Sequence, residues 1–88
     1  MTHATPNSLD GKLGFDAGAE AYRLVQAGKA PDDIAEFVRG IAICIRMQQH
    51  SAENNGTAID ASKIADAAGV SPQVVRGVRH AMDEAGKL

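Results

Sequence analysis

The sequence predicts an all-α fold, a small bundle of about four helices that contains a helix-turn-helix. Of its 88 residues, 44% are hydrophobic but only 3% are aromatic, so the core must consist mainly of Ala, Val, Ile and Leu. Such a core suits closely packed helices and disfavours a β-sandwich. Apolar residues also recur at helical spacing in four stretches, and a short Gly-Val-Ser-Pro connection joins the last two.

The chain is expected to form one domain at residues 15–88, preceded by a flexible arm at residues 1–14. The arm is rich in turn-forming residues and has few apolar anchors. Residues 15–27 are predicted as the first helix, which Gly28 ends. This helix carries small and apolar residues on two faces, which indicates close packing against a neighbouring helix.

Residues 31–50 are predicted as the longest helix, with Pro31 near its first turn and acidic residues that complement the positive end of the helix dipole. At 100° per residue one broad stripe is expected to face the core. Its members are Ile34, Phe37, Val38, Ile41, Cys44, Ile45 and Gln48. Cys44 is the only cysteine and is therefore expected to serve as a small buried hydrophobic residue.

Ile43 and Met47 lie nearly opposite this stripe, and two explanations are open. Either the first helix covers them, or they form an exposed patch at which two protomers or another protein meet. We prefer cover within the chain. The polar run at residues 51–57 contains an Asn-Gly turn signal and is predicted as a loop, followed by a short extended segment at residues 58–59.

Residues 60–85 are predicted to form the helix-turn-helix. Asp60 caps its first helix, and the small Ala65 lies where the second helix crosses closely. Gly69 ends the first helix, because a residue without a β-carbon adopts the left-handed conformation at little cost. Ser71 and Pro72 then begin the second helix as N-cap and first helical residue.

The last helix, residues 72–85, separates an apolar side from a polar side. Val75, Val78 and Met82 point one way, with Val74, Ala81 and Ala85 beside them. Gln73, Arg76 and His80 share the opposite side. This arrangement is typical of a recognition helix, in which polar side chains near the N-terminus reach base edges in the major groove.

The run GTAIDASKIADAAGVSPQVVRGVRHAMDEAGKL, residues 56–88, resembles the helix-turn-helix half of bacterial winged-helix transcription regulators such as the Rrf2-like and GntR-like families. The resemblance covers just over a third of the chain. In those families a β-hairpin wing follows the last helix, whereas this sequence ends at Leu88, so a wingless variant of the kind found in small phage proteins is expected. The resemblance implies that Ser71, Gln73, Arg76 and His80 face DNA.

The chemistry of these side chains agrees with that role. Gln73 can bond adenine and Arg76 can bond guanine, each through two hydrogen bonds. Ser71 at the helix N-terminus can hold a phosphate, and Lys63 and Arg79 are suited to backbone contacts. Two alternatives stay open: Arg79 pairs with Asp83 on the same helix, or Arg76 is only a solvated surface charge.

The first functional hypothesis is therefore a small protein that binds double-stranded DNA as a homodimer, in transcription regulation or recombination. The alternative is a protein-interaction module with the same fold, for example a phage-encoded inhibitor of a host or repressor protein. The charge balance motivates this alternative, because four basic and four acidic residues cancel within residues 60–88. DNA-binding surfaces usually carry a basic excess.

An enzyme is not expected, and neither a cofactor nor a bound metal is expected. His3, His50 and His80 show no ligand spacing with one another or with Cys44, and no nucleophile with a base is evident. No signal peptide is recognised, and the longest apolar run, residues 41–45, is too short to span a bilayer. A cytoplasmic protein without a membrane partner is expected.

Overall fold

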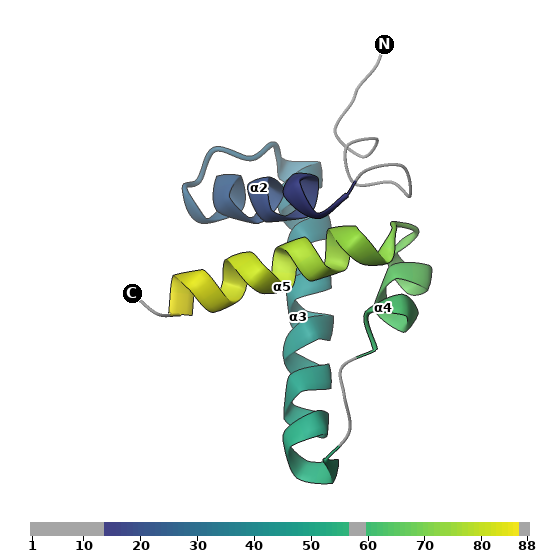
Figure 1. The fold of residues 1–88 in the computed structure, drawn as a ribbon. Helices are drawn as coiled ribbons and strands as arrows, with labels where there is room; N and C mark the ends of the chain where they lie inside the picture. Colours follow the sequence, from purple (N-terminus) through teal and green to yellow (C-terminus); the bar gives the residue numbers. More distant parts are fainter. Residues whose placement is uncertain (1–13, 57–59, 87–88) are drawn as a thin grey trace.

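The computed structural model describes residues 14–56 and 60–86, which form four α-helices and no strand (Figure 1). The helices are α2 (Phe15–Gln26), α3 (Asp32–Asn55), α4 (Ala61–Ala68) and α5 (Pro72–Gly86). The all-α prediction with a helix-turn-helix is confirmed. Residues 1–13 of the predicted arm (residues 1–14) and the predicted extended segment at residues 58–59 lie outside the described residues.

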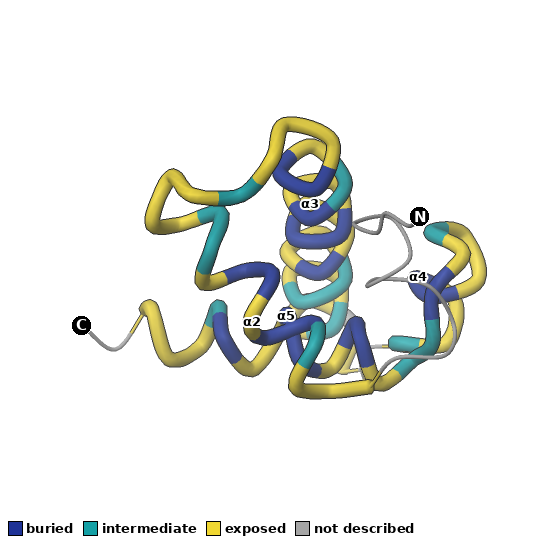
Figure 2. The backbone as a smooth tube through the Cα atoms, turned by 90° about the horizontal axis from the view of Figure 1, so that it is seen from above, coloured by how far each residue is buried: buried dark blue, intermediate teal, exposed yellow. Residues whose placement is uncertain are grey.

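All four helices contribute to one apolar core. In Figure 1, α2 and α5 lie side by side, α3 crosses behind α5, and α4 lies at the N-terminal end of α5. Buried segments, dark blue in Figure 2, occur on every helix, whereas the α2–α3 turn and the last turn of α5 are exposed. The largest fully buried side chains are aliphatic: Ile45, Val38, Val74, Val75 and Val78.

The closest helix pair is α2 with α5, and two glycines allow their backbones to meet. A β-carbon added at Gly18 would overlap the backbone carbonyl of Val74 on α5. A β-carbon added at Gly77 would overlap the backbone carbonyl of Phe15 on α2. The predicted close approach of the first helix to a neighbour is therefore confirmed, and glycines on both helices make it sterically possible.

The end of α2 follows the predicted stop at Gly28. Gly28 has φ of 71°, in the left-handed region. Its N–H donates to the Val25 carbonyl at 3.1 Å, and the Lys29 N–H donates to the Leu24 carbonyl at 2.9 Å. These two bonds satisfy carbonyls that the helix leaves open at its C-terminus.

The predicted loop at residues 51–57 is wrong, because α3 continues to Asn55. The helix ends at Gly56, which has φ of 68° and donates its N–H to the Ala52 carbonyl at 2.7 Å. The C-terminal part of α3 projects past α5 in Figure 1. A polar helix can extend into solvent in this way, since polar composition alone does not end a helix.

Two further expectations for α3 are wrong. Cys44 is exposed rather than buried. Ile41 and Ile45 point into the core, whereas the side chain of Cys44 points to one side of it. The preferred cover of Ile43 and Met47 within the chain is also wrong, since these side chains are 54% and 68% exposed. Tyr22 and Val25 of α2 line a pocket together with Ile43, so α2 lies beside Ile43 without covering it, and Met47 does not line this pocket.

Among the described residues, no helix is long and apolar enough to cross a membrane.

Candidate nucleic-acid interface

The turn between α4 and α5 is fixed by backbone hydrogen bonds around Gly69. Gly69 has φ of 74° and donates its N–H to the Asp66 carbonyl at 3.4 Å. The Val70 N–H donates to the Ala65 carbonyl at 3.0 Å, and the Val70 side chain is buried. This pattern is a Schellman motif with its usual apolar contact, so the turn holds the two helices at a defined angle.

The start of α4 is capped by Asp60, as predicted. One oxygen of its carboxylate accepts hydrogen bonds from the N–H groups of Ser62, at 3.1 Å, and Lys63, at 3.3 Å. The negative charge also lies at the positive end of the helix dipole. The cap satisfies two of the roughly four N–H groups that a helix leaves unpaired at its N-terminus.

Replacing Asp60 with alanine is expected to lower the free energy of unfolding by about 1 kcal/mol, because the two capping hydrogen bonds are lost. Denaturant unfolding followed by circular dichroism measures this change. Asp66→Ala is the matched control, since Asp66 is exposed later in the same helix and caps nothing with its side chain. An equal loss in both variants would contradict the capping role.

The start of α5 is held by Ser71. The Val74 N–H donates to the Ser71 hydroxyl oxygen at 3.3 Å and to its carbonyl at 3.1 Å. Pro72 occupies the first helical position, where its fixed φ is favourable and its missing N–H costs nothing. Ser71 is therefore an N-cap, as predicted, and its hydroxyl is engaged with the helix.

Helix α5 is anchored by one face and exposed on the other. Val74, Val75 and Val78 are buried, as predicted, while Met82 is half-buried. Ala85, predicted to lie beside the apolar side, is exposed. The buried face fixes the rotation of the helix, so the side chains on the other face have defined directions.

The polar residues predicted to face DNA are exposed on α5. Gln73, Arg76 and His80 lie within one sector of the helix, and Arg79 lies at its edge. Lys63 is exposed in the first turn of α4. Within the described residues, neither arginine forms an ion pair; in particular, the alternative pairing of Arg79 with Asp83 is absent. Both guanidinium groups are therefore available to a ligand.

His80 differs from the other predicted residues because it has neighbours on two sides. Its ring lies 5.2 Å from that of Phe15 on α2, measured between centroids and tilted by 48°. Its Nε2 atom lies 3.4 Å from a carboxylate oxygen of Glu84, one turn further along α5. His80 therefore lies where α5 meets α2, at the border of the exposed face.

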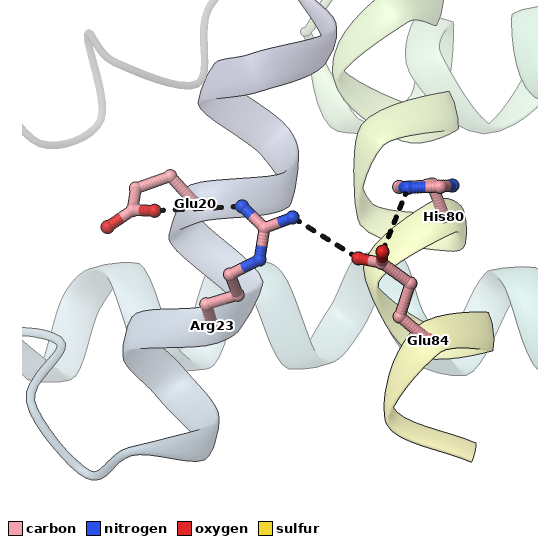
Figure 3. A network of polar contacts seen from close by, with 4 residues as sticks. All are labelled: Glu20, Arg23, His80 and Glu84. Carbon is pink, nitrogen blue, oxygen red and sulfur yellow. Dashed lines mark hydrogen bonds and ion pairs between the residues drawn. The ribbon is translucent and has the colours of Figure 1, made fainter. Parts of the chain in front are cut away.

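A polar network joins α2 to the C-terminal half of α5 (Figure 3). Arg23 of α2 donates to Glu84 at 3.2 Å and lies 3.8 Å from Glu20. The other oxygen of Glu84 faces His80. All four side chains are about half exposed, so these pairs add little to stability. Their effect is to pair Glu84 of α5 with Arg23 of α2.

The charges of α5 are separated along its length. Arg76 lies in the second turn of the helix, Arg79 lies at its middle, and Asp83 and Glu84 lie in the last third. At a rise of ~1.5 Å per residue, Arg76 and Asp83 are about 10 Å apart along the axis. On α5 itself the arginines therefore precede the acidic residues, an order that the net charge of residues 60–88 does not reveal.

A second feature is an apolar groove of about 610 Å³ between α3 and α4. Phe37, Ile41 and Ile64 line it together with Cys44, and the acidic Asp33 and Glu36 are also among its lining residues. The groove is not evident in the sequence, because the residues of α3 and α4 that line it are far apart along the chain. Its volume is in the range of ligand pockets, but it contains few polar groups to orient a ligand.

Within the described residues, no three His, Cys, Asp or Glu side chains lie close enough together to hold a metal ion. Comparisons with protein-family models, curated proteins and solved structures find no match to this chain. The resemblance to winged-helix regulators therefore remains a hypothesis based on residues 56–88.

Proposed function

We propose that the chain is a small cytoplasmic DNA-binding protein that acts as a homodimer in transcription regulation or recombination. Its α5 would enter the major groove, with Gln73 and Arg76 contacting bases and Arg79 contacting phosphates. Lys63 would add a second backbone contact, and Ser71 would bring the N-terminus of α5 close to a phosphate. His80 would contribute at the border of this surface.

One observation supports the proposal most strongly. Arg76 and Arg79 of α5 are exposed and form no ion pair among the described residues, on a helix whose opposite face is buried. Solvated arginines on a rigid helix can form hydrogen bonds with base edges and phosphates without first breaking internal pairs. The Gly69 turn supports the same helix from its N-terminal side.

The test is selection of duplexes from a random pool, followed by anisotropy titration of the enriched duplex at several salt concentrations. Arg76→Ala is expected to weaken binding by about 1–3 kcal/mol and to relax the preference at one base pair. Arg79→Ala should weaken binding to all duplexes alike. It should also reduce the steepness of the plot of log binding constant against log salt concentration by about 1, as expected when a phosphate contact is lost.

Lys29→Ala is the matched control, because it removes the same charge from an exposed position in the α2–α3 turn, far from the N-terminus of α5. It should leave affinity and sequence preference unchanged. If duplex binding persists unchanged in both Arg76→Ala and Gln73→Ala, α5 is not the reading element and the proposal is wrong.

The alternative, a protein-interaction module, is favoured by the apolar groove between α3 and α4 and by the acidic C-terminal part of α5. The duplex selection separates the two functions. No enriched duplex at low salt, together with capture of one stoichiometric protein, would favour the interaction module. Enrichment that depends on Arg76 would favour DNA binding.

A further inference from the structure

The outer face of α3 carries a stripe with the spacing of a coiled coil. Six exposed residues follow one another at intervals of four and three positions. They are Glu36, Gly40, Ile43, Met47, His50 and Asn54, and we call them the outer stripe. Alternation of four and three is the repeat of residues at the contact between two long helices. Helix α3 has 24 residues, so the stripe lies on an element about 36 Å long.

No described helix covers the outer stripe. Ile43 and Met47 are the two most exposed large hydrophobic residues of the described chain and lie at its centre. A β-carbon added at Gly40 would meet no atom within 4 Å, so the space beside it is open. At the far end, the side chains of His50 and Asn54 lie 3.2 Å apart on the same face. The stripe thus has an apolar centre between polar ends.

We infer that this face pairs with α3 of a second copy of the chain in antiparallel orientation. In the register that brings apolar groups together, Ile43 packs on Met47 of the partner subunit. The twofold symmetry of the dimer produces the same contact a second time, between Met47 and Ile43 of the partner subunit. Gly40 then faces His50 of the partner subunit, and Glu36 faces Asn54 of the partner subunit. No two like charges meet along the stripe, as a self-complementary twofold interface requires.

Charges beside the stripe select the antiparallel orientation. Arg39, Arg46 and Glu53 follow one another at seven-residue intervals on one flank, and all three are exposed. Antiparallel pairing brings Arg39 to Glu53 of the partner subunit, twice by symmetry, and Arg46 to Arg46 of the partner subunit. The two attractive pairs outweigh the one repulsive pair, which is exposed and screened by salt.

Parallel pairing lacks these advantages. Two parallel helices in register would place Glu36 against Glu36 of the partner subunit within the stripe itself. Arg39 and Arg46 would then face positions 44 and 51 of the other helix, where Cys44 and Ser51 carry no charge. Charge complementarity therefore favours the antiparallel dimer. The inference rests on the homodimer of the proposed function but not on DNA binding.

The first experiment is sedimentation velocity of the full chain over a range of concentrations. The wild type is expected to form a dimer, and Ile43→Glu and Met47→Glu are each expected to weaken it at least about tenfold, because a charge would be buried at the apolar centre. Both positions are exposed in the monomer, so far-UV circular dichroism should show unchanged folding. A wild type that stays monomeric, or a dimer that both variants leave intact, would overturn the inference.

A charge exchange then tests the orientation. Arg39→Glu is expected to weaken the dimer, and adding Glu53→Arg should restore it, because the attractive pairs re-form with reversed signs. Arg46→Ala should strengthen the dimer by removing the repulsive pair. If the double variant is as weak as Arg39→Glu, the antiparallel register is wrong.

The single cysteine gives an independent readout. Cys44 is exposed on the other flank of the stripe, and antiparallel pairing brings it opposite Cys44 of the partner subunit. A short bismaleimide should therefore link two chains, and Met47→Glu should abolish the product. Absence of the product from a stable dimer would contradict this register. A failed duplex selection leaves all these results unaffected, so the dimer and DNA binding can fail separately.

Discussion

Ile45→Ala is expected to lower the free energy of unfolding by about 2–5 kcal/mol, the largest change among the substitutions considered. Ile45 has no exposed surface and belongs to the core cluster to which all four helices contribute. Alanine would remove buried methyl and methylene groups and leave a cavity that rigid neighbouring helices fill only in part. For a domain that is stable by roughly 5–15 kcal/mol, the loss is a large share of the total. Denaturant unfolding at fixed low concentration measures it.

Ile43→Ala is the matched control, because it makes the same chemical change two positions earlier in α3. The Ile43 side chain is more than half exposed, so its loss should change the stability of the monomer by no more than about 0.5 kcal/mol. The effect of Ile43→Ala should grow with protein concentration if two copies pair through the outer stripe, whereas that of Ile45→Ala should not. Equal effects at low concentration would contradict the observed orientation of α3.

Gly77→Ala is expected to destabilise the chain by about 1–3 kcal/mol, although alanine normally favours a helix. The new β-carbon would overlap the Phe15 carbonyl and lie 2.9 Å from the backbone nitrogen of Ala19. Both obstacles are backbone atoms of α2, so the helices must separate, and rotation of a side chain cannot relieve the contact. The melting temperature should fall by several degrees, since ~1 kcal/mol corresponds to roughly 4–8 °C in a domain of this size.

Gly40→Ala is expected to have the opposite effect on the free energy of unfolding. Gly40 is also inside a helix, but a β-carbon there would meet nothing within 4 Å. Its replacement should stabilise the monomer by about 0.5–1 kcal/mol through the lower conformational entropy of the unfolded chain. Thermal unfolding of the two variants side by side separates packing from helix propensity. A stabilising Gly77→Ala would show that α2 and α5 do not meet as closely as described.

The helices and their ends could largely be predicted from the sequence, because local chemistry fixes them. Gly28 and Gly69 adopt positive φ where the periodic apolar pattern stops, and Asp60 and Ser71 cap the helices that follow. Each signal involves neighbours within a few residues. The end of α3 was missed because its polar residues are as compatible with a solvated helix as with a loop.

Contacts between distant residues could not be predicted in the same way. Gly18 and Gly77 appear in the sequence as weak helix positions, and only the packed structure shows that each makes room for another backbone. The contact of Arg23 with Glu84 joins residues 61 positions apart. The exposure of Ile43, Met47 and Cys44 depends on where α2 and α4 leave α3 uncovered, which helical periodicity alone does not determine.

In the candidate site, too, local features could be predicted from the sequence, whereas contacts between distant residues could not. The exposed side of α5 can be predicted from the sequence, since Gln73, Arg76 and His80 are all exposed there. The contact of His80 with Phe15 could not be predicted, because it joins the start of α2 to a residue 65 positions later on α5.

The close pairing of α2 with α5 also has a consequence for folding kinetics. These are the first and last described helices, so their tightest contact forms only after most of the chain has been brought into a closed loop. Loop closure costs entropy before it gains any contact energy, whereas α4 and α5 can meet through a three-residue turn. The helix-turn-helix is thus expected to form early, and the docking of α2 should set the rate at which the native state is completed.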